Sequence, residues 1–190
     1  LGPLKNSGRE FDRLFKTGAS VDLQFGIDPD AEETRQAPVA GDKRLLMTLA
    51  KLSAAAGSRT RESSDRSLTT SATKADQPQP IAVLFDALVP GTPEDKRWRV
   101  VSPVAEVFFD RVSRVDGIKL AAENLDNGYN VEAAIPLKSL GLNPAPNLRL
   151  KFDWGVLSTD QDGNVVLRRR YWSNQATGIV ADAPSEARLT

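Results

Sequence analysis

A single segment, Val104–Pro144, constrains the fold of this chain more than any other. Its pattern predicts a long buried strand, then a hairpin, then one capped helical turn. The sequence Asp126-Asn127-Gly128 suits a two-residue type I′ turn, because Asn and Gly both tolerate a positive φ. Pro136 then opens a helical turn that Gly141 closes. This succession is typical of antiparallel β-structure.

Centring the turn on Asn127 and Gly128 sets the register of the predicted hairpin. The expected cross-strand pairs are Val131 with Asn124, Ala133 with Ala122, Ile135 with Leu120, and Glu132 with Glu123. One face of both strands is then mostly apolar and the other is polar, as a half-buried antiparallel pair requires. The facing glutamates would be mildly destabilising.

Other strands are expected on both sides of this segment. Alternating or apolar runs bounded by turn signals occur at 20–26, 43–52, 81–85, 97–101, 104–112, 148–156 and 165–172, and a last strand starts near 186–189. The run 43–52 also fits a helical stripe, but its position between turns favours a strand. About nine short strands and no long helix predict an antiparallel β-sandwich, in one domain spanning 1–190.

Residues 53–80 differ in kind from the rest of the chain. They contain one large aliphatic residue, Leu68, no aromatic residue and mixed charge. Such a segment cannot bury enough surface to offset the entropy of ordering it. We expect an exposed, mobile hairpin insertion, and a functional lid is the less favoured alternative.

Composition excludes several classes of function. Lys+Arg and Asp+Glu both number 25, so the charge balance favours neither nucleic acid nor an anionic membrane. The absence of cysteine and histidine excludes disulfides, thiolate metal sites and the usual general base. No apolar run approaches the roughly 18 residues of a membrane span. No signal peptide is visible, and both ends look cut from a longer chain.

The expected strand 104–112 carries Glu106, Phe108 and Asp110 on one side. This acid–aromatic–acid row would line a polar pocket if the strand is central. The favoured alternative is that the two acids pair with arginines of a neighbouring strand, such as Arg168 or Arg170, because acids deep in a sheet usually survive only when paired.

The run GYNVEAAIPLKSLGL, preceded by EVFFDRV and followed by YWSN and DAPSEARL, resembles the family 9 carbohydrate-binding modules and their DOMON-like relatives. The pieces LFKTGASVDLQFGIDPDA and VAGDKRLLMTLAKL are similar to a sub-group appended to large secreted bacterial proteins. The resemblance covers most of the chain except 53–80. It implies a jelly-roll-like, non-catalytic β-sandwich that binds polysaccharide ends, sometimes with structural calcium. A related branch of the superfamily binds haem.

The resemblance also marks where a sugar site would lie. Two tryptophans sandwich the sugar in that family, and the matching positions here hold Val100 and Val180, so that binding mode is expected to be lost. Glu106 matches an acidic residue of the family's binding face. Trp98, two positions before Val100, is a candidate displaced stacking residue.

The end of the strand 165–172 supplies the other candidates. Trp172 lies where the strand leads into a loop, with Asn174 two residues on, and binding residues gather at such places. Alternation puts Arg168 and Arg170 on one face of that strand. Trp154 falls on the apolar face of its own strand, which favours core packing.

Calcium and haem are the cofactors to consider. Asp28 with Asp30, and Asp160 with Asp162, are oxygen-rich, but turn chemistry alone explains both pairs and structural calcium is the less favoured alternative. Haem would need an axial ligand from Met47 or the lysines, and Met47 is expected in the core.

The sequence therefore predicts a non-catalytic, carbohydrate-binding-like module of a larger exported bacterial protein, secreted, periplasmic or at the cell surface. Its expected partners are a polysaccharide or glycan and the other domains of its parent chain. The alternative is a structural or protein-interaction domain that has lost the sugar site, and a haem-binding DOMON-like domain comes third. An enzyme is disfavoured because Glu106 and Asp110 would lie about 13 Å apart at their Cα atoms on one strand, too far for a glycosidase pair.

Overall fold

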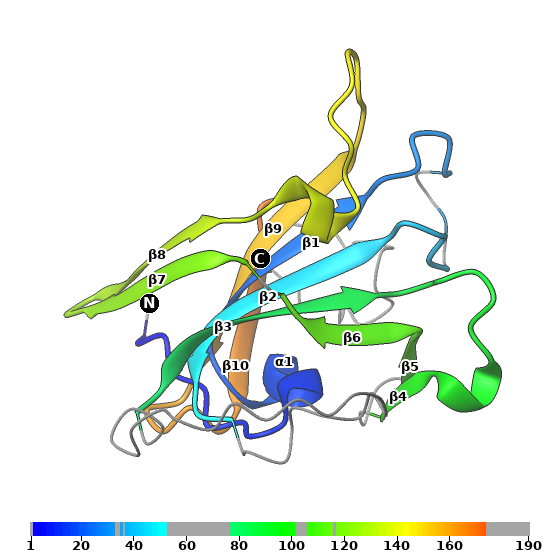
Figure 1. The fold of residues 1–190 in the computed structure, drawn as a ribbon. Coiled ribbons are helices and arrows are strands. Elements are labelled where there is room, and N and C mark those ends of the chain that lie inside the picture. Colours follow the sequence, from blue (N-terminus) through cyan, green and yellow to red (C-terminus); the bar gives the residue numbers. More distant parts are fainter. Residues whose placement is uncertain are drawn as a thin grey trace, which may run out of the picture.

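The computed structural model describes residues 2–32, 35, 37–52, 77–101, 106–115 and 117–173. In this part of the chain ten strands form one six-stranded sheet and two two-stranded hairpins, and every pairing between these strands is antiparallel (Figure 1). Of the expected insertion 53–80, residues 53–76 lie outside the described residues, as does the expected last strand near 186–189. Gln79 and Pro80 belong to a strand, so the insertion was placed too far along the chain at its end. No helix in the described part is long and apolar enough to cross a membrane.

The six-stranded sheet has the order β10-β9-β1-β2-β3-β6. Its strands are β1 (Ser20–Gly26), β2 (Lys43–Ala50), β3 (Gln79–Asp86), β6 (Arg111–Arg114), β9 (Lys151–Thr159) and β10 (Val166–Tyr171). The predicted strands 20–26 and 43–52 are confirmed, and so is the return of 81–85 onto the second of them, with Leu84 paired to Leu45. The helical alternative for 43–52 is therefore wrong.

The predicted long strand 104–112 is broken at Asp110, and the prediction of one continuous strand is wrong. β5 (Glu106–Phe109) pairs with β4 (Trp98–Val101), whereas β6 joins the six-stranded sheet beside β3. Asp110 stabilises the bend between them. Its N–H donates to the carbonyl of Asp86 at 3.0 Å, and its carboxylate accepts the N–H of Val89 at 2.8 Å. Such a corner moves the chain from one sheet to another.

The predicted hairpin is confirmed as β7 (Lys119–Leu125) and β8 (Gly128–Ala134), but its register is shifted by two residues. The observed pairs are Leu120 with Ala133, Ala122 with Val131, Asn124 with Tyr129, Glu123 with Asn130, and Ala121 with Glu132. The turn therefore lies at residues 126–127, and neither Asn127 nor Gly128 has a positive φ, so the predicted type I′ turn is wrong. An even shift leaves each side chain on its predicted face and separates the two glutamates.

A 3-10 turn follows this hairpin as predicted. η4 (Leu137–Leu140) begins after Pro136 and ends at Gly141, which adopts a left-handed conformation with φ of 68°. The amide of Gly141 donates to the carbonyl of Lys138 at 3.0 Å, and glycine accepts that conformation without steric cost. The turn carries Leu140 into the core, where it is 3% exposed.

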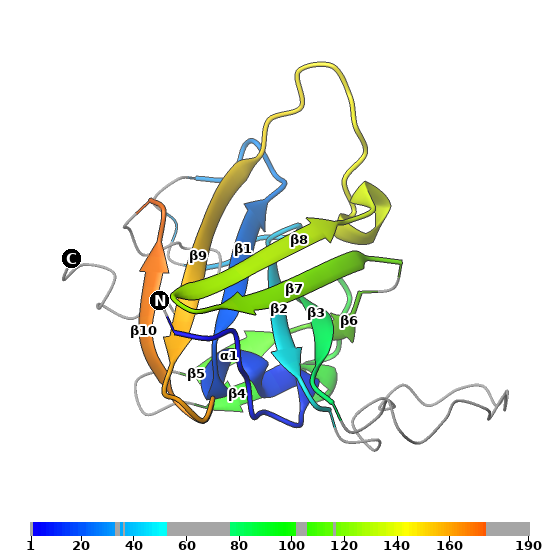
Figure 2. The same ribbon diagram turned by 90° about the vertical axis from the view of Figure 1, so that its left-hand side faces the viewer.

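Both faces of the six-stranded sheet are covered over part of their area. We call one the α1 face, because η1 (Phe11–Arg13), α1 (Leu14–Thr17) and the β4–β5 hairpin pack on it around Phe15, Phe85 and Phe109. We call the other the hairpin face, because the β7–β8 hairpin and η4 cover it; the hairpin crosses in front of the sheet in Figure 2. Met47 lies in the core of the hairpin face, as expected.

A buried ion pair spans β1 and β2 on the α1 face. The guanidinium of Arg44 donates from Nε and Nη2 to the two carboxylate oxygens of Asp22, each at 2.9 Å, and both side chains are at most 1% exposed. The ring of Phe15 lies 4.7 Å from the Arg44 guanidinium carbon. Tyr171, at the end of β10, donates its hydroxyl to the same carboxylate. Burial first, and then the charge of Asp22, raise the pKa of Tyr171.

We expect Asp22→Ala to lower the free energy of unfolding by about 3–5 kcal/mol, because the buried guanidinium of Arg44 would lose its carboxylate. Urea unfolding followed by circular dichroism measures this loss. Glu10→Ala is the control, since Glu10 and Arg13 form an exposed pair whose loss should cost less than about 0.5 kcal/mol. A loss below about 1 kcal/mol for Asp22→Ala would show that the pair is not the centre of this fold.

Candidate functional site

The acid–aromatic–acid row predicted on residues 106–110 is neutralised by two arginines of β4. Arg99 forms an ion pair with Glu106, and Arg97 donates to Asp110 at 2.6 Å. The guanidinium of Arg97 also lies 5.1 Å from the centre of the Phe108 ring. Pairing with arginines of a neighbouring strand is therefore confirmed, but the predicted partners on β10 were wrong.

The partners differ because the bend at Asp110 removes β5 from the six-stranded sheet. β5 pairs only with β4, whose arginines face the acids along the exposed side of this two-stranded hairpin. The carboxylate of Asp110 is 3% exposed, since it lies at the bend and is held by Val89 as well as by Arg97. This surface presents no unpaired acid to a ligand.

Trp98 lies on the opposite side of the β4–β5 hairpin from Glu106 and Phe108. It pairs with Phe109, which is fully buried, and its ring meets that of Phe11 edge-on at 5.8 Å. Val100, on the same side, is 5% exposed. The structure thus makes Trp98 part of the packing on the α1 face and separates it from the acidic row.

The remaining predicted residues belong to β10, at the far edge of the six-stranded sheet from β6. Arg170 pairs with Val156 and is exposed, and Trp172 follows the strand. Their side of the sheet is the hairpin face, whereas the β4–β5 hairpin packs on the α1 face. Asn174 lies outside the described residues. The predicted residues therefore do not form one site.

The outer part of the hairpin face carries a cluster of exposed aromatic residues. Neither β9 nor β10 contributes a residue to the core beneath the β7–β8 hairpin. The exposed fractions are 43% for Phe152, 44% for Trp154 and 72% for Trp172. The expectation that Trp154 lies in the core is wrong, because the hairpin core stops at β1. We name the surface formed by Phe152, Trp154, Arg168, Arg170 and Trp172 the β9–β10 aromatic face.

Hydrogen bonds from the backbone hold the two tryptophans in place. The N–H of Trp172 donates to the carbonyl of Trp154 at 2.8 Å and so continues the β9–β10 register. Asp153 is 4% exposed and accepts three hydrogen bonds: from the N–H of Trp154 at 2.8 Å, and from the N–H and hydroxyl of Ser173 at 3.2 and 2.7 Å. The carboxylate therefore ties the end of β10 to β9.

Sequence reasoning missed Asp153, although a signal was present. An acid inside a strand of alternating apolar residues must find partners, and a serine follows Trp172 in the chain. Gly155 is a second requirement of the site. A Cβ atom there would lie 2.5 Å from the carbonyl oxygen of Arg170 and 2.6 Å from the Tyr171 ring, so only glycine lets β10 approach β9 this closely.

The aspartate pairs considered for calcium make turn contacts instead. Asp28 accepts the N–H of Asp30 at 2.9 Å, and Asp160 accepts the N–H of Asn164 at 2.7 Å. The hydrogen bond from Asn164 is the main cause that lowers the pKa of Asp160. Within the ranges that the structure describes, no three acidic side chains gather as a metal site would require. These turn hydrogen bonds account for Asp28 and Asp160, whereas Asp162 is 80% exposed beside Lys5.

Comparisons with protein-family models, with curated proteins and with solved structures gave no match to this chain. Its function is therefore inferred from the geometry of its own surface.

We expect Asp153→Ala to release the end of β10, because the N–H groups of Trp154 and Ser173 would lose a buried acceptor. Hydrogen exchange at the Trp172 amide should speed up more than exchange in β2. The free energy of unfolding should fall by about 1–3 kcal/mol. Asp162→Ala is the control, since that carboxylate is 80% exposed. Unchanged protection of the Trp172 amide would contradict the anchoring role.

Tyr129 gives a pH prediction for the hairpin beside this face. Its hydroxyl is buried and has no hydrogen-bond partner among the described residues, and burial raises its pKa from 10.0 to about 12. The folded chain thus holds this proton more tightly than the unfolded chain, so stability should fall as pH rises from about 10 to about 12. Tyr129→Phe should reduce that fall and preserve stability at pH 7, as urea unfolding can measure. An identical fall in both proteins would contradict the assignment, since the only other tyrosine, Tyr171, is present in both.

Proposed function

We propose that this chain is a non-catalytic module that binds polysaccharide on the β9–β10 aromatic face. The observation that carries the proposal is that two exposed tryptophans, Trp154 and Trp172, are fixed next to each other on paired backbone. Flat aromatic faces stack on the apolar C–H faces of pyranose rings, and nearby donors fix the sugar hydroxyls. Arg170, on the same face, supplies such donors.

The state of the buried carboxylates supports binding rather than hydrolysis. Each of them is held by a cation, by backbone N–H groups or by a hydroxyl: Asp22, Asp42, Asp86, Asp110 and Asp153. Hydrolysis of a glycosidic bond needs two carboxyl groups facing each other across an open cleft. The aromatic face carries arginines in place of such a pair.

The proposal also includes the layer architecture of the fold and the family to which the chain is related. We infer a jelly-roll-like β-sandwich, in which the β7–β8 hairpin is part of the second layer, related to the family 9 carbohydrate-binding modules. The antiparallel hairpin followed by η4 supports this inference. An exported bacterial parent protein follows from the same resemblance. Because Val100 is buried in the core, the proposed site lies elsewhere than that family's tryptophan sandwich.

A second candidate function is docking of another domain of the parent chain. Leu148, Leu150 and Leu167 are exposed by 43%, 39% and 62% in and beside β9 and β10. Aliphatic side chains contribute little to sugar stacking, whereas protein interfaces bury them. This observation favours the structural or interaction alternative, and the binding experiment below separates the two functions.

We expect Trp172→Ala and Trp154→Ala each to weaken polysaccharide binding about tenfold, because each removes one stacking surface. Affinity electrophoresis against plant and algal polysaccharides measures the effect. Phe108→Ala is a matched control: Phe108 is an exposed aromatic residue on the β4–β5 hairpin, outside the proposed site. Circular dichroism should show unchanged folding in all three variants.

Two results would contradict the proposed function. Loss of binding in Phe108→Ala but not in Trp172→Ala would place the site on the β4–β5 hairpin. If no polysaccharide slows the protein in the gel, domain docking would be the better explanation of the exposed face.

A further inference from the structure

Two arginines of β10, Arg168 and Arg170, precede Trp172 on the face that carries both tryptophans. Alternation from the observed pairs of Arg168 with Ser158 and of Arg170 with Val156 places both arginines on the face that carries Trp154. Trp172 continues the same series. Successive residues on one face of a strand lie about 7 Å apart, so Arg168, Arg170 and Trp172 extend over about 13 Å. This span is longer than one sugar ring and suits a linear polymer.

Arg168 and Arg170 have no counter-charge among the described residues, as is also true of Arg114 and Arg149. The two arginines of β10 are exposed, and neither guanidinium makes an ion pair or hydrogen bond with the described part of the chain. By contrast, Arg97 and Arg99 on β4, Arg44 on β2 and Arg111 on β6 are each paired with a carboxylate. A guanidinium left unpaired beside exposed aromatic residues is suited to a carboxylate or sulfate from a ligand.

The described acidic groups on β9 and on the β7–β8 hairpin form no ion pair with the two arginines. Glu123 and Glu132 alternate with the residues of β7 and β8 that face the sheet, so both lie on the outer side of the hairpin. Asp126 lies in the hairpin turn and is exposed. The buried Asp153, on the α1 face, is already held by Trp154 and Ser173. Among the described residues, no carboxylate neutralises the positive charge of this face.

We propose that the β9–β10 aromatic face selects an acidic polysaccharide, one that carries carboxylate or sulfate groups on its sugar rings. The inference rests on the proposed function, since it names the class of polymer that the same face binds. Trp154 and Trp172 stack on sugar rings, while Arg168 and Arg170 pair with the anionic groups along the polymer. Because the chain has a formal net charge of +0, this preference comes from the local cluster rather than from the overall charge.

Affinity electrophoresis with matched polymers tests the inference. The acidic probes are polygalacturonate and alginate, which carry carboxylates, and carrageenan, which carries sulfates; the neutral probes are xyloglucan and galactomannan. We expect stronger retardation by at least one acidic polymer than by either neutral polymer. The double variant Arg168→Gln with Arg170→Gln should weaken that binding about tenfold, as the loss of charged hydrogen bonds predicts. Binding of polygalacturonate or alginate would identify carboxylate as the anion, and binding of carrageenan would identify sulfate.

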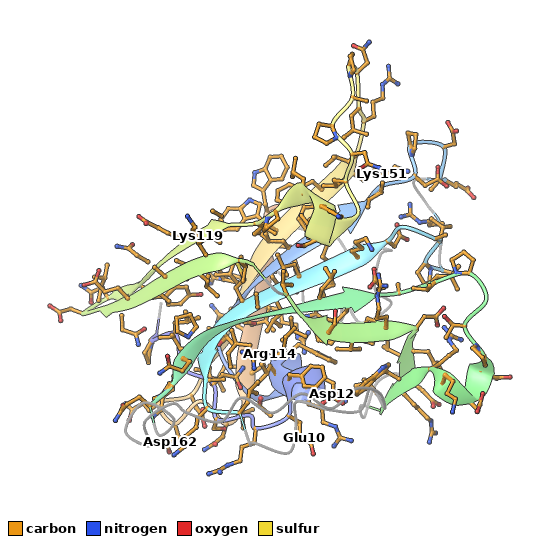
Figure 3. All side chains as sticks on the ribbon, in the orientation of Figure 1. Glu10, Asp12, Arg114, Lys119, Lys151 and Asp162 are labelled. Carbon is orange, nitrogen blue, oxygen red and sulfur yellow. The ribbon has the colours of Figure 1, made fainter. Side chains whose placement is uncertain are left out.

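Arg114→Gln is the control for non-specific attraction. Arg114 is also exposed but lies on β6, at the opposite edge of the sheet (Figure 3). Equal loss in Arg114→Gln and in the double variant would overturn the inference, and so would equal retardation by neutral and acidic polymers. Retention of acidic-polymer binding in the double variant, with loss in Trp172→Ala, would overturn the arginine role while leaving the proposed function intact. Retardation by no polymer would overturn both.

Discussion

The buried pair of Asp22 and Arg44 is the constraint on which the rest of this structure depends. Two full charges lie inside the sheet with at most 1% exposure, so the fold must keep their geometry or leave a charge without its counter-ion. The pair joins β1 to β2, and the hydroxyl of Tyr171 extends it to β10. Tyr171 directly precedes Trp172 in the chain. The buried ion pair thus also holds the end of β10, because Tyr171 bonds to it. Trp172, the next residue, lies on the opposite, exposed face.

β9 explains why the aromatic face exists at all. Its residues 153, 155 and 157 point to the α1 face, where Leu157 is fully buried, while Phe152 and Trp154 point to the hairpin face. The core beneath the β7–β8 hairpin includes no residue of β9, so the same alternation that fills one core leaves Phe152 and Trp154 partly exposed on the other side of β9. An apolar residue on a strand is buried only if some other element reaches it, and that depends on where a distant hairpin lies.

Local sequence therefore predicted where the strands lie in the chain, but it predicted poorly which sheet a strand joins and which of its side chains are buried. The strands 20–26 and 43–52 and the hairpin around 126–128 follow from alternation and turn residues, which act between near neighbours. The break at Asp110 depends on a hydrogen bond from Val89 and on pairing with Asp86, both distant in sequence, so no local pattern marked it. The same limit made Trp154 look like a core residue. Trp172 and Arg170, by contrast, were candidates from sequence, because a strand end that leads into a loop is itself a local signal, and the structure leaves both exposed.

The distribution of charge separates the two surfaces that sequence had joined into one site. On the β4–β5 hairpin each acid already has an arginine, so a ligand would have to displace an internal partner before it gained a new one. On β10, Arg168 and Arg170 have no such partner among the described residues, and a ligand anion would pair with them at the cost of desolvation alone. Because the overall charge is balanced, long-range attraction would contribute little to binding an anion, and the local arrangement of charge would matter more. The β9–β10 aromatic face thus combines exposed aromatic rings with two arginines that are not paired to a carboxylate among the described residues.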